Sequence, residues 1–284
     1  MAFHFPVMPR LYMGLRRGSR ECISEILAHT PQIPDGCQWG TFLRNHDELT
    51  LEMVTEEDRH YMWEEYAPES RWRCNLGIRR RLSPLVDNDD AKIRLLNAML
   101  LSLPGSPVLY YGDEIGMGDD PWLPDRDGVR TPMQWDDSET AGFSTALPED
   151  FHLPLIRTFG HDPEHVNVAR QMDDPSSLLV WTRAMLGIRH HPVFGTGEFT
   201  DLGGPDMAVM SFLRHNEHET VLCLANLSDT ERTVALHLPQ FAGVAGSSLI
   251  HGQDAQPVKA DGTLSVPLWP YGYRWLQMSG EERS

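Results

Sequence analysis

Residues 41–50, with the sequence TFLRNHDELT, end an apolar run with a cluster of ionisable side chains. His46 and Asp47 stand side by side where the run stops, and Glu48 follows them. A carboxylate beside an imidazole at the end of a buried strand suits a site that processes sugars. Glycosidic chemistry needs a pair of carboxylates, and this segment offers one good member, Asp47. A surface turn is an equally good interpretation, because Asn and Asp both favour turns.

A second cluster occupies residues 126–135, RDGVRTPMQW. The guanidinium groups of Arg126 and Arg130, with Asp127 and an indole, suit a neutral polyol, which needs planar hydrogen-bond donors and an aromatic face. The alternative is an Arg–Asp ion pair that only fixes a long loop. Residues 110–114, YYGDE, form a third cluster, whose tyrosines we interpret as core residues at a strand end.

The charge balance excludes several classes of function. A formal net charge of -17 repels phosphate backbones and anionic lipids, so we expect no nucleic-acid or membrane binding. The one basic run, residues 79–81, is predicted to be solvated near a helix end. The longest apolar stretch, residues 95–111, is interrupted by Pro and Gly, which predicts a helix and a strand rather than a membrane span.

Motifs of other chemistries are absent from the sequence. The histidines form no HExxH or comparable ligand set, so we predict no metal site and no cofactor in this chain. No GxSxG or GxGxxG motif is present, which excludes serine hydrolases and nucleotide binding of those types. The four cysteines show no CxxC spacing, and the N-terminus has no signal-peptide pattern, so a cytoplasmic location is expected.

The three clusters need strands and helices to position them. Apolar residues 2–15 predict a strand at the start of the chain, and residues 39–43 and 108–111 predict two more. Thr55 and residues 87–90 read as N-caps of two helices, the second carrying an apolar stripe from Ile93 to Leu103. Residues 115–172 form a long loop, and Asp174 caps a further helix that begins at Pro175.

Beyond residue 192 the apolar period changes from helical to two. Strands are predicted, between turn signals, at residues 197–202, 207–213, 220–227, 233–238, 248–251, 263–268 and 271–278. Their spacing predicts a C-terminal antiparallel β-sandwich of roughly 85 residues.

In order and spacing, residues 42–47, 105–114 and 126–135 closely resemble successive motifs of the α-amylase family of glycoside hydrolases. Residues 1–6 and 46–53 resemble those members that interconvert maltose and trehalose. The resemblance covers essentially the whole chain. It implies an α/β partial TIM barrel over residues 1–194, similar to strands six to eight of a (β/α)8 barrel, and an antiparallel β-sandwich over residues 195–284.

The resemblance also implies roles for the site residues. Asp47 would be the third family carboxylate, which stabilises the oxocarbenium-like transition state. His46 would bond the same sugar ring, and Arg130 would hold its far hydroxyl. Glu48, Arg126 and Asp127 would contact substrate, with Glu48 and the loop at residues 119–135 shaping the acceptor side. Calcium ligands of the full-length family would lie outside this chain.

Two family carboxylates, the nucleophilic Asp after strand four and the acid/base Glu after strand five, have no counterpart in the sequence. We therefore expect the C-terminal part of an enzyme that acts on maltose and trehalose, inactive alone. One alternative is part of an α-glucosidase. Another is a non-catalytic module that completes a split enzyme, with an N-terminal barrel half or a second copy as partner. The first roughly 190 residues should be poorly stable unless paired, because a partial barrel leaves open sheet edges.

Overall fold

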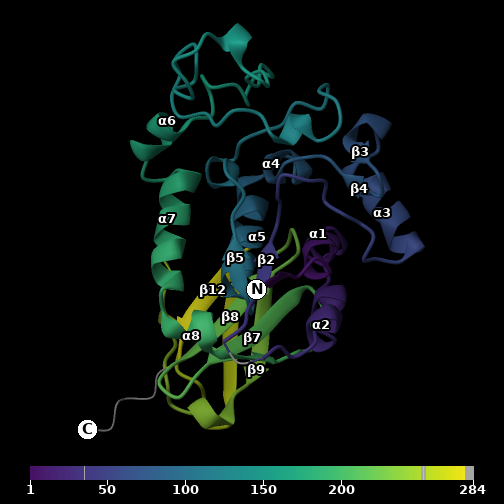
Figure 1. Cartoon of the computed structure of the whole chain (residues 1–284). Coiled ribbons are helices and arrows are strands. Elements are labelled where there is room, and N and C mark those ends of the chain that lie inside the picture. Colours follow the sequence, from purple (N-terminus) through teal and green to yellow (C-terminus); the bar gives the residue numbers. More distant parts are fainter. Residues whose placement is uncertain (35, 251, 253, 279–284) are drawn as a thin grey trace.

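A parallel three-stranded sheet stands at the centre of the N-terminal part of the chain. The computed structural model describes residues 1–34, 36–250, 252 and 254–278. The sheet has the order β1-β2-β5, and its strands are β1 (Ala2–Phe3), β2 (Trp39–Phe42) and β5 (Ser106–Val108). Both pairings are parallel, so all three carboxyl ends lie at one edge of the sheet (Figure 1).

Helices connect the parallel strands, since a parallel pair cannot be joined by a tight hairpin. Two helices lie between β1 and β2: α1 (Val7–Arg17) and α2 (Glu21–Ala28). The elements between β2 and β5 are α3 (Glu56–Tyr66), η1 (Ser70–Trp72), β3 (Arg73–Cys74), β4 (Gly77–Ile78), α4 (Leu82–Leu85) and α5 (Asp90–Ser102). Strands β3 and β4 pair as a small antiparallel hairpin.

The predicted strand at residues 2–15 is wrong beyond Phe3, because the chain turns into α1 at Val7. Two residues that disfavour helices made this helix hard to predict from the sequence. Pro9 lies in the first turn of the helix. A backbone N–H at that position would have no partner within the helix, so the N–H that proline lacks is not missed. Gly14 lies where a Cβ atom would stand 2.6 Å from Ile23 Cδ1 of α2. The glycine therefore lets the two helices approach closely.

Two predicted N-caps are confirmed and one is wrong. The Thr55 hydroxyl accepts from the Asp58 amide at 3.1 Å, and Asp89 accepts from the amides of Ala91 and Lys92. Helix α7 (Leu178–Arg189) is capped by Ser177 instead of Asp174. Asp174 accepts from the Ser176 amide at 2.8 Å and so shapes the turn before the helix.

The predicted long loop is confirmed in most of its length. Its regular elements are short: η2 (Asp113–Ile115), η3 (Asp127–Val129), η4 (Pro148–Asp150) and α6 (Val168–Met172). Ile115, Met117, Met133 and Ile156 form a small apolar core of its own. In Figure 1 this loop lies at the top, beyond the carboxyl ends of the parallel strands.

The C-terminal strands form two antiparallel layers. One sheet has the order β10-β12-β8-β7-β6, with β6 (Glu198–Asp201), β7 (Val209–His215), β8 (Thr220–Asn226), β10 (Ser247–Ser248) and β12 (Tyr273–Gln277). The other pairs β9 (Arg232–His237) with β11 (Thr263–Leu268). Helix α8 (Pro192–Thr196) precedes these strands, and η5 (Pro239–Phe241) follows β9. Each predicted strand overlaps an observed one; for residues 248–251, position 251 lies outside the described residues.

The five-stranded sheet buries both of its faces. Leu222 and Leu276 face the β9–β11 layer and share a core with Val234 and Leu264. Residues on the other face, such as Phe212 and Trp275, belong to the core that also contains the helices and β2. Phe194 of α8 packs against Trp275 with ring centroids 4.8 Å apart. The helical part and the sandwich are therefore held by one continuous core. No helix within the described part of the chain is long and apolar enough to cross a bilayer.

Candidate functional site

A cavity of about 460 Å³ opens at the carboxyl ends of the three parallel strands. Phe3, Phe42 and Val108, one residue from each strand, form part of its wall. The rest of the wall includes the loop after β2, from Arg44 to Glu48, and Tyr110 after β5. The first sequence cluster and the start of the third thus meet where parallel sheets commonly place functional side chains.

The loop that carries Asp47 is held through its backbone. The Asp47 amide donates to the Asn45 side-chain oxygen at 2.9 Å, and the Asp47 carbonyl accepts from Arg44 Nη2 at 2.8 Å. Arg44 is 1% exposed and its Nε also donates to the Arg80 carbonyl at 2.6 Å. From the other side, Arg130 Nε donates to the His46 carbonyl at 2.8 Å. Two guanidinium groups therefore fix the loop from opposite sides and leave the Asp47 carboxylate to other contacts.

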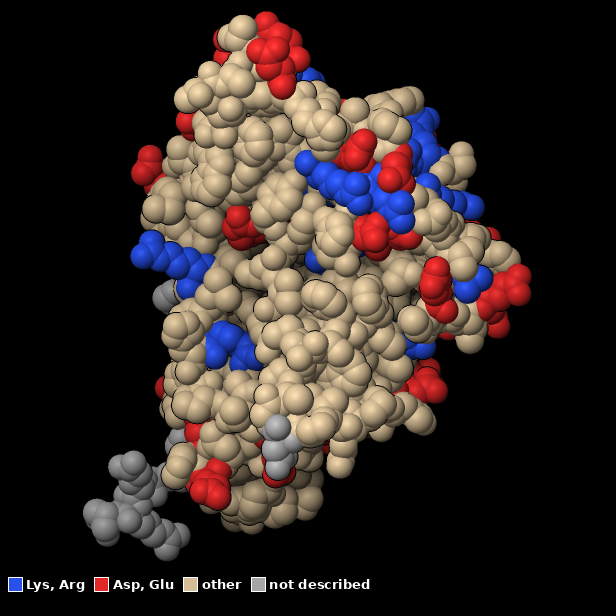
Figure 2. Space-filling view, viewed as in Figure 1, with Lys and Arg blue, Asp and Glu red and all other residues tan. Residues whose placement is uncertain are grey.

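One arginine holds both neighbouring carboxylates. Arg126 Nε lies 2.5 Å from Asp47 Oδ1 and 2.8 Å from Glu48 Oε2. Arg130 stands farther off, with Nη2 4.0 Å from Asp47 Oδ1 and Nη1 3.7 Å from Asp127 Oδ1. Figure 2 shows Lys and Arg side chains gathered among Asp and Glu side chains on the upper part of the molecule.

The contacts of Asp47 decide its protonation. Burial opposes ionisation, but the interaction with Glu48 and the positive charge of Arg126 outweigh it and hold the pKa of Asp47 below its usual range. Asp47 is thus a carboxylate at neutral pH. In that form it can stabilise a developing positive charge, but it cannot supply a proton to a leaving group.

The third cluster ties the end of β5 to the second cluster. The Tyr110 hydroxyl donates to the Val129 carbonyl at 2.9 Å, and the Tyr111 hydroxyl donates to the Thr131 carbonyl at 2.7 Å. The interpretation of these tyrosines as core residues is wrong for Tyr111, which is 38% exposed.

The prediction that residues 79–81 are solvated is also wrong. Arg81 is fully buried; its amide donates to Asp119 Oδ2 at 2.6 Å and its Nη1 to the Tyr111 carbonyl at 2.7 Å. Arg80 Nε pairs with Asp119 Oδ1 at 2.9 Å, and Arg79 Nη1 donates to the Leu123 carbonyl at 2.7 Å. These partners lie far along the sequence, in the loop that follows β5. The basic run therefore fastens that loop over the strand ends.

Asp113 is a second buried carboxyl group near these arginines, in addition to Asp119. Its Oδ1 lies 3.7 Å from Arg81 Nη1, and it is 4% exposed. Burial raises the pKa of Asp113 to about 7, despite the nearby charges of Arg81 and Arg44. The carboxyl group faces protein on all sides, so we treat it as a structural partner of the buried arginines.

Of the six residues predicted for the site, His46, Asp47 and Glu48 line this cavity. Arg126 and Arg130 contact them from the loop after β5, and Asp127 lies beside Arg130. The sequence did not indicate the parts played by Arg44 and Arg81, nor that Asn75 donates to Glu48 at 3.0 Å. Arg44 directly precedes Asn45 in the first cluster. That position was the one feature of the sequence that could have indicated a role for Arg44 at the site.

A second, aromatic cavity of about 520 Å³ adjoins the site at Arg130 and Tyr111. Trp135, Phe143 and Phe151 line it, with Glu114 and His152 as polar neighbours. Most of the residues that line this cavity are part of the long loop. Across the described residues, no group of three or more His, Cys, Asp or Glu side chains is placed to hold a metal ion.

Comparison with known proteins gives concordant matches. The family described as "Alpha amylase, catalytic domain" matches residues 19–197, and "Maltogenic Amylase, C-terminal domain" matches residues 202–275. A "Trehalose synthase" of Pimelobacter sp. is 54% identical over 98% of this chain and 49% of its own length. A "Trehalose synthase/amylase TreS" of Mycobacterium tuberculosis is 51% identical over 99% of this chain and 47% of its own length.

Among solved structures, the alpha-amylase from H. orenii has a TM-score of 0.69 at 20% identity, over 97% of this chain and 48% of its own. At that identity the likeness concerns the fold. The chain spans about half the length of the curated relatives it matches.

Proposed function

This chain belongs to the α-amylase family of glycoside hydrolases, and we propose that it is the C-terminal part of a trehalose synthase, an enzyme that interconverts maltose and trehalose. The high identity to proteins of that name over nearly the whole chain supports this. The observation that carries the proposal is the fixed, ionised Asp47 at the carboxyl ends of parallel strands, beside a cavity large enough for a sugar.

We assign the parallel sheet to strands six to eight of a (β/α)8 barrel, with residues 1–194 as barrel and 195–284 as sandwich. The parallel order β1-β2-β5 with helical crossovers supports this assignment. The change from one matching family to the other between residues 197 and 202 supports the boundary.

Asp47 is proposed as the carboxylate that stabilises the oxocarbenium-like transition state. His46, whose imidazole is exposed at the cavity, and Arg130 would bond hydroxyls of the same glucosyl ring. Arg126, Glu48 and Asp127 would bound the neighbouring acceptor site. The aromatic cavity at Trp135 adjoins it and would exclude water, which otherwise diverts transfer to hydrolysis.

The proposed reaction is a double displacement. A carboxylate attacks the anomeric carbon of maltose, the glycosidic bond breaks, and an acid donates a proton to the departing glucose. The released glucose turns, and its anomeric hydroxyl attacks the glucosyl-enzyme and returns the proton. Asp47 is held ionised by Arg126, so it suits neither proton transfer. Because the sequence has no counterpart of the family's nucleophilic Asp and acid/base Glu, both would come from residues outside this chain.

We further propose that a barrel half of the same enzyme, or a second copy of the chain, is the partner that covers the open sheet edges. Phe3 on the edge strand β1 is 53% exposed, which supports a covering partner. Calcium, where the full-length enzyme binds it, would be held by that other half. A cytoplasmic location stays a prediction; the four cysteines, all free, are compatible with it.

The test is to incubate the purified chain with maltose, alone and after co-expression with the N-terminal half of the Pimelobacter relative. We expect no product from the chain alone and trehalose from the pair, with Asp47→Ala abolishing it. Trehalose or glucose formed by the chain alone, at a rate that Asp47→Ala removes, would refute the proposed inactivity.

The alternatives give different outcomes in the same assay. An α-glucosidase origin predicts free glucose as the main product of the reconstituted pair, because water would be the acceptor. A non-catalytic module predicts co-purification of the two halves with no dependence of the rate on Asp47. Failure of the halves both to co-purify and to act would leave the split-enzyme interpretation without support.

A further inference from the structure

A cavity of about 410 Å³ lies at the junction between the helical part and the sandwich. Trp39 at the start of β2 and Gly105 just before β5 line it, so it lies beside the amino ends of these strands. The Asp47 site lies at their carboxyl ends. Phe199 of β6 and Arg214 of β7 form the wall on the sandwich side. The volume of this junction cavity is in the range of small-molecule sites, about 300 to 1,000 Å³.

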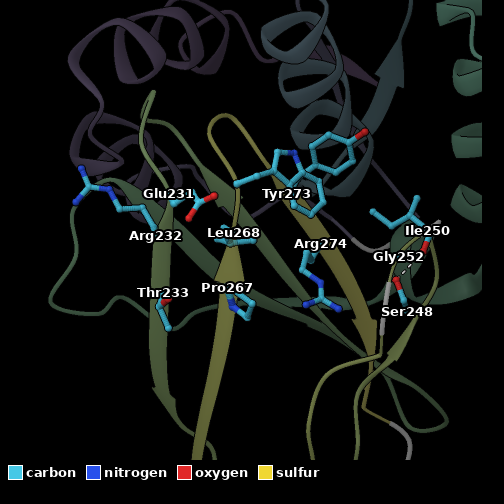
Figure 3. Close-up of a pocket in the computed structure, with 11 residues that line it drawn as sticks. Glu231, Arg232, Thr233, Ser248, Ile250, Gly252, Pro267, Leu268, Tyr273 and Arg274 are labelled. Carbon is cyan, nitrogen blue, oxygen red and sulfur yellow. Dashed lines mark hydrogen bonds between the residues drawn. The ribbon is translucent and has the colours of Figure 1, made fainter.

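The junction cavity is positively charged. The described residues that line it include Arg214 but no aspartate or glutamate. A second cation stands close by, because Arg189 Nη2 of α7 donates to the carbonyl of Gly105, a lining residue, at 2.8 Å. A cavity within the sandwich differs in this respect, since Glu231 and Arg274 both line it (Figure 3). An anion would therefore meet attraction without a facing carboxylate in the junction cavity.

Neither arginine is neutralised by an anionic group of the described chain. Burial lowers the pKa of Arg189 and of Arg214 to about 10, and the groups that act on them include the Cys223 thiol but no carboxylate. Arg214 donates to uncharged backbone carbonyls. Arg189 Nε is buried and has no hydrogen-bond partner among the described residues. A buried charge is normally paired, because its removal from water is costly. An anion in the cavity would supply the missing countercharge.

The remaining walls suit a polar body attached to such an anion. The polar lining residues are Thr30, Gln32, Gln38 and Thr41. Thr41 is 4% exposed, and within the part of the chain that the structure describes its hydroxyl has no hydrogen-bond partner. Trp39 adds an aromatic face. Hydroxyl and amide groups beside a ring can bind a small molecule that carries hydroxyl groups.

We propose that the junction cavity binds a small phosphate ester, with the phosphate group toward Arg214 and Arg189 and the polar body against Trp39. A phosphate monoester carries a charge of about -1.5 to -2 at neutral pH, which matches two guanidinium groups, and the planar guanidinium suits its oxygens. A chloride ion would leave most of the cavity unfilled. The proposal goes beyond the proposed function, because no residue of the Asp47 site lines this cavity.

The test is calorimetric titration of the purified full chain with glucose 6-phosphate. We expect a Kd of about 1 mM or tighter, weakened about fivefold or more by Arg189→Gln. The matched control is Arg183→Gln, an exposed arginine on the same helix, which should bind as the unaltered chain does. Circular dichroism verifies that each variant is folded.

A second pair of variants tests the cavity by its shape. Gly195 lines the cavity, and open space surrounds a Cβ atom added there, so Gly195→Phe can take up room in the cavity without a collision at Cβ. This variant should also weaken binding about fivefold or more. Gly187→Phe is the control, because Gly187 lies on α7 with equally open space and does not line the cavity.

Two cysteines report where the ligand binds. Cys37 is exposed and lines the junction cavity, whereas Cys74 Sγ lies 3.6 Å from Asp125 Oδ1, beside the Asp47 site. Alkylation by iodoacetamide, followed by peptide mass spectrometry, should slow about fivefold or more at Cys37 when glucose 6-phosphate is well above its Kd. It should be unchanged at Cys74. Protection of Cys74 instead of Cys37 would place the ligand in the Asp47 site and overturn the proposal.

Two simpler ligands test its chemical class. Glucose should need at least about tenfold higher concentration to protect Cys37, because it lacks the charge. Inorganic phosphate should need about threefold or more, because it lacks the polar body. Equal protection by glucose would overturn the anion site, and equal protection by phosphate would overturn the ester. No binding of glucose 6-phosphate, or binding unchanged by both Arg189→Gln and Gly195→Phe, would overturn the site altogether. None of these results bears on whether the reconstituted enzyme forms trehalose.

Discussion

Arg214 joins the helical part of the chain to the sandwich, and its replacement tests whether the two share one core. The residue lies in β7 and is 1% exposed. Its Nη1 donates to the Ser102 carbonyl at the end of α5 at 2.8 Å. Its Nη2 donates to the carbonyls of Gly197 at 2.9 Å and Phe194 at 3.2 Å, both at α8. One buried cation thus caps the ends of two helices.

Arg214→Met keeps much of the apolar length. It removes these three charge-assisted hydrogen bonds and a longer, fourth one from Nε to the Glu198 carbonyl, at 3.4 Å. Each such bond contributes about 1.5 to 3 kcal/mol to stability. An opposing term is the cost of burying the guanidinium, which lowers the pKa of Arg214 from 12.5 to about 10, equivalent to about 3 kcal/mol. Because the carbonyls of Ser102 and Phe194 would also stay buried without these donors, we expect a net loss of about 3 kcal/mol in the free energy of unfolding.

The assay is urea unfolding of the full chain, followed by circular dichroism and by tryptophan fluorescence. A loss of about 3 kcal/mol should lower the urea midpoint by about 1 M or more. The matched control is Arg183→Met, an exposed arginine on α7, which should change the stability by less than about 0.5 kcal/mol. Equal midpoints for Arg214→Met and the unaltered chain would refute the reasoning, because they would mean that these bonds do not couple the two parts.

Two further predictions concern the Asp47 loop. Arg126→Gln should raise the pKa of Asp47, measured by carboxyl carbon NMR, because a charge that favours the carboxylate is removed; an unchanged or lower pKa contradicts the ion pair. Since the folded pKa of Asp47 lies below its unfolded value, near 4, the pair stabilises the fold above that pH and loses its effect as the pH falls through the folded pKa. Gly77→Ala should destabilise the chain by about 1 to 3 kcal/mol, because a Cβ atom there would collide with the Leu49 carbonyl and stand 2.6 Å from Glu48 Cγ. Gly187→Ala, where open space surrounds the added carbon, is the control, and equal urea midpoints for the two variants would exclude the collision.

Much of the sandwich could be predicted from the sequence, and the reason is local. Its strands alternate between two buried faces, as Leu222 and Cys223 show, and turn residues separate them. Helix α5 was equally clear, since a capping aspartate and an apolar stripe agree. Helix α1 was hidden because Gly14 reads as a helix breaker, whereas its value lies in the contact with Ile23 of another helix.

The charged residues around the site also show that contacts between distant parts of the sequence could not be predicted. The grouping of Asp47 and Glu48 was visible because they are neighbours in the sequence. The burial of Arg81 was not, since its partners Tyr111 and Asp119 lie 30 and 38 residues away and no local pattern connects them. An isolated arginine run looks solvated until the loop that covers it is in place.

These long-range contacts show how the Asp47 loop is held in place within this chain. Arg44 and Arg130 hold the Asp47 loop by its carbonyl oxygens, and both bonds come from within this chain. Placement of the loop therefore does not depend on a partner chain. The ion pair with Arg126 is different, because it occupies the carboxylate for which we propose a role in the reaction. We therefore expect a completing partner to shift the Arg126 side chain and to leave the backbone around Asp47 where it is, a difference that amide hydrogen exchange of the loop would detect.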